Sequence, residues 1–152
     1  MCCVSSFSAT PVVATGSSDD GVDLSFSALP SGDVRILQLR NGDDTVGNIQ
    51  LRANGALRLR NDGTAVGVET AALSPNTLYR IGLRQRQGTG SDAILEAYLA
   101  VGTAAFTTPF ATLTNGVWVG AADRMRAGVT SGAAIDLILD DIRIDSATMP
   151  GP

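Results

Sequence analysis

The sequence contains no histidine and no lysine, and its two cysteines stand side by side near its start. Without histidine there is no Ser-His-Asp or Cys-His arrangement, which argues against the usual nucleophilic hydrolases. Cys2 and Cys3 are neighbours, so they can form only a strained disulfide. Two thiols without histidine also fall short of the four ligands of a structural zinc. We therefore expect no cofactor and no metal.

Aromatic residues are scarce, at 5% of the chain, and the formal net charge is -4. Nucleic-acid binding depends on neutralising phosphates, so a nucleic-acid partner is not expected. The start of the chain lacks a basic segment followed by a long apolar stretch, and no run is long enough to span a bilayer. We expect no signal peptide, no membrane partner and synthesis in the cytoplasm.

The 152 residues that are present correspond to about one domain, and 44% of them are hydrophobic. Short runs with period-two alternation are separated by Gly, Asn, Asp and Pro, which is typical of an all-β protein. No window favours an amphipathic helix; the run 93–101 has helical propensity but alternates cleanly. Beside the opening stretch and the closing run 134–146, the expected strands begin at Val22, Val34, Asn48, Ala56, Ala65, Leu78, Ala93 and Gly116.

One hairpin follows in detail from the sequence "NIQLRANGALRLR". A two-residue Asn54-Gly55 turn would place Arg52 opposite Leu57 on one face. A three-residue loop instead pairs Leu51 with Leu57 and puts Gly55 at the left-handed position of a G1 bulge. The alternation favours the three-residue loop, with Gly55 in a structural role.

Arginines gather on the faces that such strands would turn outward. The first hairpin carries Arg52, Arg58 and Arg60, and the run from Leu78 carries Arg80, Arg84 and Arg86. Bidentate guanidinium contacts suit an anionic glycan or an acidic protein surface. Solvated outer strand faces balanced by aspartates are the alternative.

The closing run "AIDLILDDIRIDS" raises the question of what Asp140 and Asp141 do inside a strand. The apolar residues Ile135, Leu137 and Leu139 occupy odd positions, whereas Ile138, Ile142 and Ile144 occupy even positions, so the apolar phase changes across the pair. A change of phase requires a bulge or bend, where an aspartate can accept bonds from unpaired backbone N–H groups. We interpret the pair as structural; a calcium site and a catalytic role are the alternatives.

The segments "LRANGALRLRNDG", "LSPNTLYRIGLRQRQG" and "LDDIRIDS" resemble the concanavalin A-like lectin/glucanase superfamily with its laminin-G-like relatives. The resemblance covers roughly Val22 to Ser146 and implies a jelly-roll sandwich of two antiparallel sheets. We expect residues 22–146 to form this sandwich, and the polar ends to form an N-terminal arm or first strand (1–21) and a C-terminal tail (147–152). The glucanases of this superfamily carry a Glu-x-Asp-x-x-Glu motif, whereas Glu69 and Glu96 stand alone here.

Missing carboxylate pairs argue against glycoside hydrolysis, which needs two carboxylates roughly 5 to 10 Å apart. Asp140 and Asp141 are adjacent, so in an extended strand they point to opposite faces. We therefore expect that the chain is not an enzyme and has no catalytic residues.

Three aromatic residues are candidates for contacts with a partner. Trp118 suits sugar stacking or a place in the core, and Phe106 and Phe110 lie in a Thr-rich loop where they form an interface or pack beneath the sandwich.

Two classes of function remain open from the sequence. The first is a virion structural protein, such as a phage capsid decoration or cement protein, located on the virion surface and acting as a homo-oligomer, a trimer among them, with capsid proteins as partners. The second is a carbohydrate-binding, lectin-like module. The absence of a signal peptide and the scarcity of aromatics favour the first.

Overall fold

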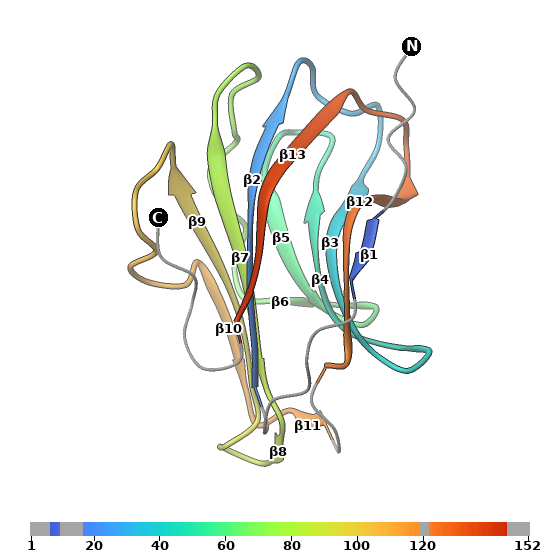
Figure 1. Ribbon diagram of the computed structural model, residues 1–152, viewed down its shortest axis with the longest axis vertical. Coiled ribbons are helices and arrows are strands. Elements are labelled where there is room, and N and C mark those ends of the chain that lie inside the picture. Colours follow the sequence, from blue (N-terminus) through green and yellow to red (C-terminus); the bar gives the residue numbers. More distant parts are fainter. Residues whose placement is uncertain (1–6, 10–16, 119–121, 146–152) are drawn as a thin grey trace.

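A computed structural model describes residues 7–9, 17–118 and 122–145, which form two stacked β-sheets (Figure 1). The described residues contain no helix, so they include no helix that could cross a membrane. The strands are β1 (Phe7–Ala9), β2 (Ser17–Phe26), β3 (Val34–Asn41), β4 (Asp44–Leu51), β5 (Leu57–Asn61), β6 (Thr64–Val66), β7 (Tyr79–Arg86), β8 (Gly88–Thr89), β9 (Ile94–Val101), β10 (Ala111–Thr114), β11 (Val117–Trp118), β12 (Arg124–Gly132) and β13 (Leu137–Asp145).

The two main sheets are antiparallel throughout. The six-stranded sheet has the order β1-β12-β3-β4-β5-β6, and the five-stranded sheet has the order β10-β9-β7-β2-β13. Strands β8 and β11 form a small ribbon at one end, the bottom of Figure 1. The predicted all-β fold with two antiparallel sheets is confirmed.

The core lies between the inner faces of the two sheets, as period-two alternation requires. Leu24 of β2, Ile81 of β7 and Leu95 of β9 meet Leu39 of β3 and Ile49 of β4, and each is fully buried. Branched aliphatic side chains dominate this layer, so the hydrophobic effect favours one register for each strand.

The first hairpin has the predicted three-residue loop. Leu51 pairs with Leu57, and Gly55 adopts a left-handed conformation with φ of 87°. The Arg52 N–H donates to the Ala56 carbonyl at 2.8 Å and closes the loop. The predicted register and the position of Gly55 are confirmed.

The sandwich begins earlier than the expected boundary at Val22. Strand β2 starts at Ser17 and lies between β7 and β13, with Ser17 opposite Arg86 and Asp19 opposite both Arg84 and Asp145. Within the same N-terminal segment, β1 pairs with β12. The opening stretch was expected as an arm or a first strand, but the polar residues 17–21 did not indicate where pairing begins, because any residue type can supply backbone pairing.

Two expected strands are shorter than predicted. The run from Ala65 contributes only the end of β6, and residues 67–78 form a loop that leads to β7. The run from Gly116 contributes only Val117–Trp118. The loop 67–78 is held by backbone bonds to the first hairpin, including Leu73 N–H to the Gly55 carbonyl at 2.9 Å.

Candidate functional site

The outer face of the six-stranded sheet collects most of the arginines. Cross-strand partners point to the same face of a sheet, and the register places Arg124 opposite Arg40, Arg126 opposite Gln38, Arg35 opposite Gln50, and Gln50 opposite Arg58. We call this surface the arginine face. It consists of Arg35, Arg40, Arg52, Arg58, Arg60, Arg124 and Arg126.

Amide side chains lie between these arginines at the level of the sheet. Gln38 and Asn48 are opposite each other on β3 and β4, and both are buried. Gln38 Nε2 donates to Thr45 Oγ1 at 2.5 Å, and Asn48 Nδ2 donates to the Asp62 carbonyl at 3.1 Å. The Oδ1 atom of Asn48 is buried and has no hydrogen-bond partner among the described residues. Most buried polar atoms in folded proteins have a partner, so this oxygen can accept a hydrogen bond from a water molecule or a ligand.

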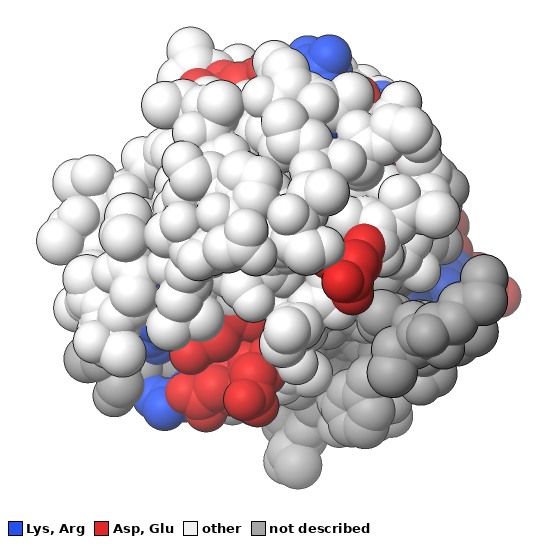
Figure 2. Space-filling model, turned by 90° about the horizontal axis from the view of Figure 1, so that it is seen from above, with Lys and Arg blue, Asp and Glu red and all other residues white. Residues whose placement is uncertain are grey.

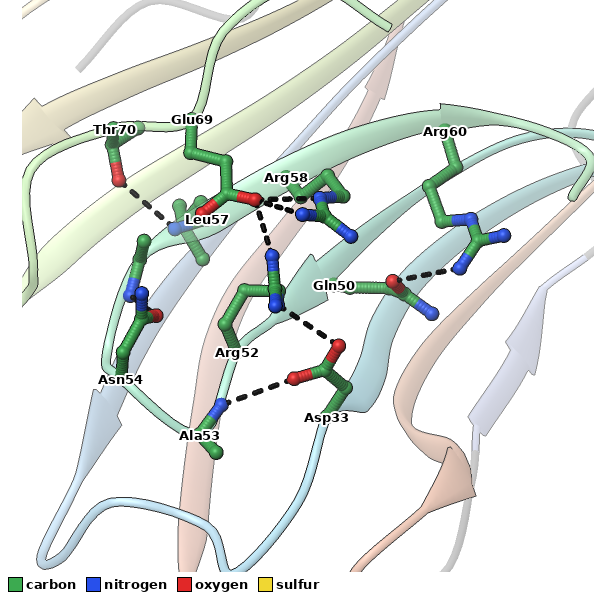
Figure 3. A network of polar contacts seen from close by, with 11 residues as sticks. Asp33, Gln50, Arg52, Ala53, Asn54, Leu57, Arg58, Arg60, Glu69 and Thr70 are labelled. Carbon is green, nitrogen blue, oxygen red and sulfur yellow. Dashed lines mark hydrogen bonds and ion pairs between the residues drawn. The ribbon is translucent and has the colours of Figure 1, made fainter. Parts of the chain in front are cut away.

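Figure 3 shows the ion-pair network at one end of the arginine face. Glu69 Oε1 accepts hydrogen bonds from both Arg52 and Arg58, the latter from Nε at 2.7 Å. Arg52 Nε also lies 2.9 Å from Asp33 Oδ2. Next to Glu69, Thr70 Oγ1 accepts from Leu57 N–H at 2.9 Å, so the loop 67–78 is fastened to β5. The network fixes two guanidiniums on the rim of the face.

The network also shifts the pKa of its members. Desolvation alone would raise the pKa of Asp33, but the hydrogen bond from the Ala53 N–H and the contact with Arg52 outweigh it and hold that pKa below its usual value. The hydrogen bond to Asp33 is the main cause that raises the pKa of Arg52. Both groups are therefore charged at neutral pH.

At the other end of the face, Arg40 lies 3.8 Å from the exposed Asp43, and the neighbouring arginines contact neutral groups. Arg60 donates to Gln50 Oε1 at 3.2 Å and to the Gly63 carbonyl, which are neutral acceptors. Within the described part of the chain, Arg124 and Arg126 contact no carboxylate. The positive charge of these arginines is available to an anionic ligand.

The remaining predicted contact residues lie elsewhere, so the structure separates the two arginine groups. Arg84 and Arg86 belong to β7 of the five-stranded sheet, where Arg84 Nη1 lies 3.4 Å from Glu96 Oε2 and Arg86 Nε donates to the Asp92 carbonyl at 2.7 Å. Trp118 belongs to β11 and pairs with Gly88 through the backbone; its side chain lies outside the described parts.

The Thr-rich loop folds over the outer face of the five-stranded sheet. The Phe106 ring packs on Tyr98, with centroids 5.7 Å apart, and lies 5.1 Å from the guanidinium of Arg80. Arg80 is 4% exposed and its Nε lies 3.3 Å from Asp23 Oδ1. Phe110 packs against the core. This face is therefore partly covered by the chain itself.

Tyr98 has the largest pKa shift on that covered face. Burial and, after it, the hydrogen bond from Tyr98 Oη to Glu96 Oε2 at 2.7 Å raise the pKa of Tyr98 to about 12. The phenol is consequently neutral and a hydrogen-bond donor at physiological pH.

The Asp140–Asp141 pair lies at a β-bulge. The register of β13 against β2 shifts between Asp140 and Arg143, and Asp141 has φ of 48°. Asp140 Oδ1 accepts the Asp141 N–H at 2.8 Å, and both Asp141 oxygens receive hydrogen bonds from Arg143 at 3.0 and 2.6 Å. In the described ranges no group of three His, Cys, Asp or Glu residues comes together to hold a metal.

No family model and no curated protein sequence matches the chain. Solved structures do match it. An alginate lyase of polysaccharide lyase family 7 superposes with a TM-score of 0.60 at 18% identity, over 95% of this chain and 63% of the lyase. An endo-β-1,4-glucuronan lyase from the fungus Trichoderma reesei gives 0.59 at 14% identity, over 87% of this chain and 69% of the lyase. Trypanosoma rangeli sialidase gives 0.58 at 13% identity, over 85% of this chain and 20% of the sialidase.

These likenesses show that the fold is a jelly-roll sandwich of two antiparallel sheets, as predicted. The chain spans 63% of the length of the alginate lyase and a smaller part of the sialidase. At such low identity the superpositions show a shared fold, and the activities belong to the named proteins.

The comparisons contradict two predictions made from the sequence. The solved structures that share the fold are carbohydrate-processing enzymes, so the interpretation as a non-catalytic virion structural protein, such as a capsid decoration or cement protein, is wrong. The expectation that the chain is not an enzyme conflicts with the same finding. It relied on the absence of hydrolase carboxylates and histidine, and a lyase does not need a hydrolase's carboxylate pair.

Sequence reasoning missed four of the seven arginines of the arginine face. Arg124 and Arg126 alternate with Met125 in "DRMRAG", which was a usable signal for a common outward face. Arg35 and Arg40 are five residues apart in "VRILQLR", so strict alternation would place them on opposite faces. They share a face because the register of β3 shifts after Arg35. The pairing of β12 with β3, which unites the two strands, involves residues distant in the chain.

Proposed function

We propose that the chain is a carbohydrate-active β-sandwich whose arginine face binds an acidic polysaccharide. The observation that carries this proposal is the row of arginines and buried amides across β12, β3, β4 and β5. Guanidiniums bind carboxylates through paired hydrogen bonds, and amides bind hydroxyl groups as both donors and acceptors. A polymer with one carboxylate on each sugar matches such a surface.

The similar structures support this ligand class. Alginate and glucuronan, the polymers in the names of two of the similar lyases, are both polyuronates. The overall charge of -4 repels a polyanion at long range. Salt screens interactions between charges that are more than roughly 10 Å apart, so the charge of the arginine face itself determines whether a polyanion binds there.

The test is binding of the purified chain to alginate and polyglucuronate, with a neutral β-glucan as the comparison. Isothermal titration at two or more salt concentrations gives affinity and salt dependence. We expect binding to the polyuronates alone, weakening as salt rises. The variant Arg124→Gln with Arg126→Gln should lose about tenfold or more in affinity, since a hydrogen bond between charged groups contributes about 1.5–3 kcal/mol.

A matched control comes from the opposite sheet. Arg86→Gln with Arg84→Gln removes the same charge from the five-stranded sheet and should leave the affinity for polyuronates within about twofold. Equal losses in the two double variants, or equal binding of the neutral glucan, would contradict a specific arginine face.

Polyuronate lyase activity is a second candidate function. It is favoured by the shared fold with two lyases and by the arginines, because β-elimination requires that the uronate carboxylate be neutralised while a base removes the neighbouring proton. The carboxylates on the arginine face, Asp33 and Glu69, are both engaged in ion pairs with arginines. Ultraviolet absorbance of an unsaturated uronate product, followed in the same polymer solutions, tests for elimination.

A further inference from the structure

A hollow lined by both polar and apolar side chains lies at the end of the sandwich where β2 ends and β13 begins, on the side away from the arginine face. Its volume is about 370 Å³, which falls in the range of small-ligand sites, roughly 300–1,000 Å³. Serine, asparagine, threonine and aspartate side chains form its polar part. The lining consists of Ser25, Phe26, Ser27, Asn76, Thr77, Leu78, Asp136 and Ile138.

Three segments that are distant in sequence form the hollow and are fastened to one another. Ser27 Oγ donates to Asp136 Oδ2 at 3.0 Å, and the Ser27 N–H donates to the Asp136 carbonyl at 3.3 Å. The Asn76 N–H donates to the Phe26 carbonyl at 2.8 Å, with Asn76 held at φ of 57°. These bonds fix the walls in place before a ligand arrives, which lowers the entropy cost of binding.

Polar groups in the hollow retain hydrogen-bonding capacity. Among the described residues, no group donates to Asp136 Oδ1, and the side-chain amide of Asn76 has no partner. A carboxylate oxygen accepts from hydroxyl groups, and an amide both donates to and accepts from them. The arrangement suits a ligand that carries several adjacent hydroxyls.

Two exposed aliphatic side chains stand beside these polar groups. Leu78 is 42% exposed and Ile138 is 65% exposed, although most large apolar side chains of this chain are buried. Ser25 lies opposite Ile138 in the strand pairing, so polar and apolar groups alternate along one wall. Binding of an apolar ligand surface would remove Leu78 and Ile138 from water, a gain of about 25 cal/mol per Å².

The charge around the hollow excludes an acidic ligand. Asp136 is the only charged residue that lines it within the described parts of the chain, and no arginine does. Seen from above, this end of the molecule is mostly uncharged, and its largest group of acidic side chains lies beside basic ones (Figure 2). A uronate carboxylate would face Asp136 without a counter-charge.

We infer that this hollow is a second carbohydrate site, which binds a neutral pyranose with its hydroxyls toward Asp136, Asn76 and Thr77 and its C–H face toward Leu78 and Ile138. A pyranose has the required combination of several hydroxyls and an apolar face. The site is independent of the arginine face and holds whether or not that face binds a polyuronate.

The experiment is a nuclear magnetic resonance titration of the full chain with methyl glycosides of glucose, galactose and mannose, and with glucuronate and glycerol as comparisons. We expect at least one neutral glycoside to shift the backbone amide signals of Ser27, Asn76 and Thr77, with a Kd on the order of 1 mM. Glucuronate and glycerol should bind at least about tenfold more weakly.

Substitutions of the lining residues test whether the glycoside binds in the hollow. Asp136→Asn should weaken the glycoside about fivefold or more, because a neutral acceptor forms hydrogen bonds about half as strong as a charged one. Asp44→Asn, which makes the same change at the exposed first residue of β4 in the other sheet, should have no effect. Ile138→Ser, on an exposed position, keeps the fold and tests the apolar wall.

Some results would overturn this inference. They are the absence of amide shifts with all three glycosides, shifts of equal size with glycerol, or an affinity unchanged in both Asp136→Asn and Ile138→Ser. The Arg124→Gln, Arg126→Gln variant separates the two sites, because it should weaken polyuronate binding and leave glycoside binding unchanged.

Discussion

A Cβ atom built on Gly47 of β4 would lie 2.6 Å from Cδ1 of Leu95 on β9, so the two sheets are too close at this point for any side chain. Leu95 is fully buried and cannot turn outward to make room. We expect Gly47→Ala to lower the free energy of unfolding by about 1–3 kcal/mol through overpacking. Chemical denaturation measures the change.

Gly63→Ala is the matched control, since the nearest heavy atom to its added Cβ is Arg60 Nη2 at 4.0 Å. It should change stability by less than about 0.5 kcal/mol. Adding Leu95→Ala to Gly47→Ala should cost less than the sum of the two single changes, because the smaller side chain relieves the clash. Equal stability of the Gly47 and Gly63 variants would show that the sheets separate easily here.

Glu69→Gln should destabilise the protein by about 1–2 kcal/mol. The glutamate accepts bonds from Arg52 and Arg58, and its side chain is 28% exposed. A neutral amide would leave the partly buried Arg58 without this counter-charge and Arg52 with Asp33 alone. Asp43→Asn is the control, because the fully exposed Asp43 lies 3.8 Å from Arg40 and such pairs contribute little. Similar losses in the two variants would argue against a structural role for the network.

We expect the stabilisation of the fold by Asp33 to be lost in acid. The pKa of Asp33 is held below its ordinary value of about 4, because the Ala53 N–H and Arg52 outweigh desolvation. A lowered folded-state pKa contributes stability above the unfolded pKa, and this stability is lost as the pH falls through the folded pKa. The stability difference between the wild type and Asp33→Asn should therefore be constant near neutral pH and shrink below about pH 4. A difference that persists in strong acid would contradict the ion pair.

The hairpin around Gly55 and the arginine face differ in how far the sequence could predict them. The hairpin register depends on local alternation and on the conformation of one glycine, so a short segment contains all the information. The arginine face depends on β12 lying beside β3, and no local pattern specifies the order of strands in a sheet. Strand β2 extends to Ser17 for a related reason, because backbone pairing with β7 and β13 needs no apolar residues.

We expect the stabilisation of the fold by Tyr98 to be lost in alkali. Burial and the bond to Glu96 raise the pKa of Tyr98 to about 12, so the folded state retains its proton where the unfolded chain, at about 10, has lost it. Stability from this residue is complete below about pH 10 and is lost as the pH rises toward about 12. Tyr98→Phe should make unfolding less dependent on pH in this interval, measured by denaturation together with the ultraviolet titration of tyrosinate. An unchanged pH dependence would contradict the predicted shift.

We expect substitutions of Asp141 to affect stability through its backbone conformation in the β-bulge and not through loss of a metal site. Its φ of 48° suits glycine, asparagine and aspartate, so Asp141→Val should destabilise by about 1–2 kcal/mol, whereas Asp141→Asn and Asp141→Gly should cost less.

Arg143 occupies both Asp141 oxygens, and Asp140 Oδ1 accepts the Asp141 N–H, which leaves too few oxygens for a calcium ion that needs about six. Calcium in the millimolar range should accordingly leave the melting temperature unchanged in the wild type and in Asp141→Asn alike. A calcium-dependent rise that disappears in Asp141→Asn would establish a cation site at the bulge, and it would require Arg143 to release the carboxylate that it binds in this structure.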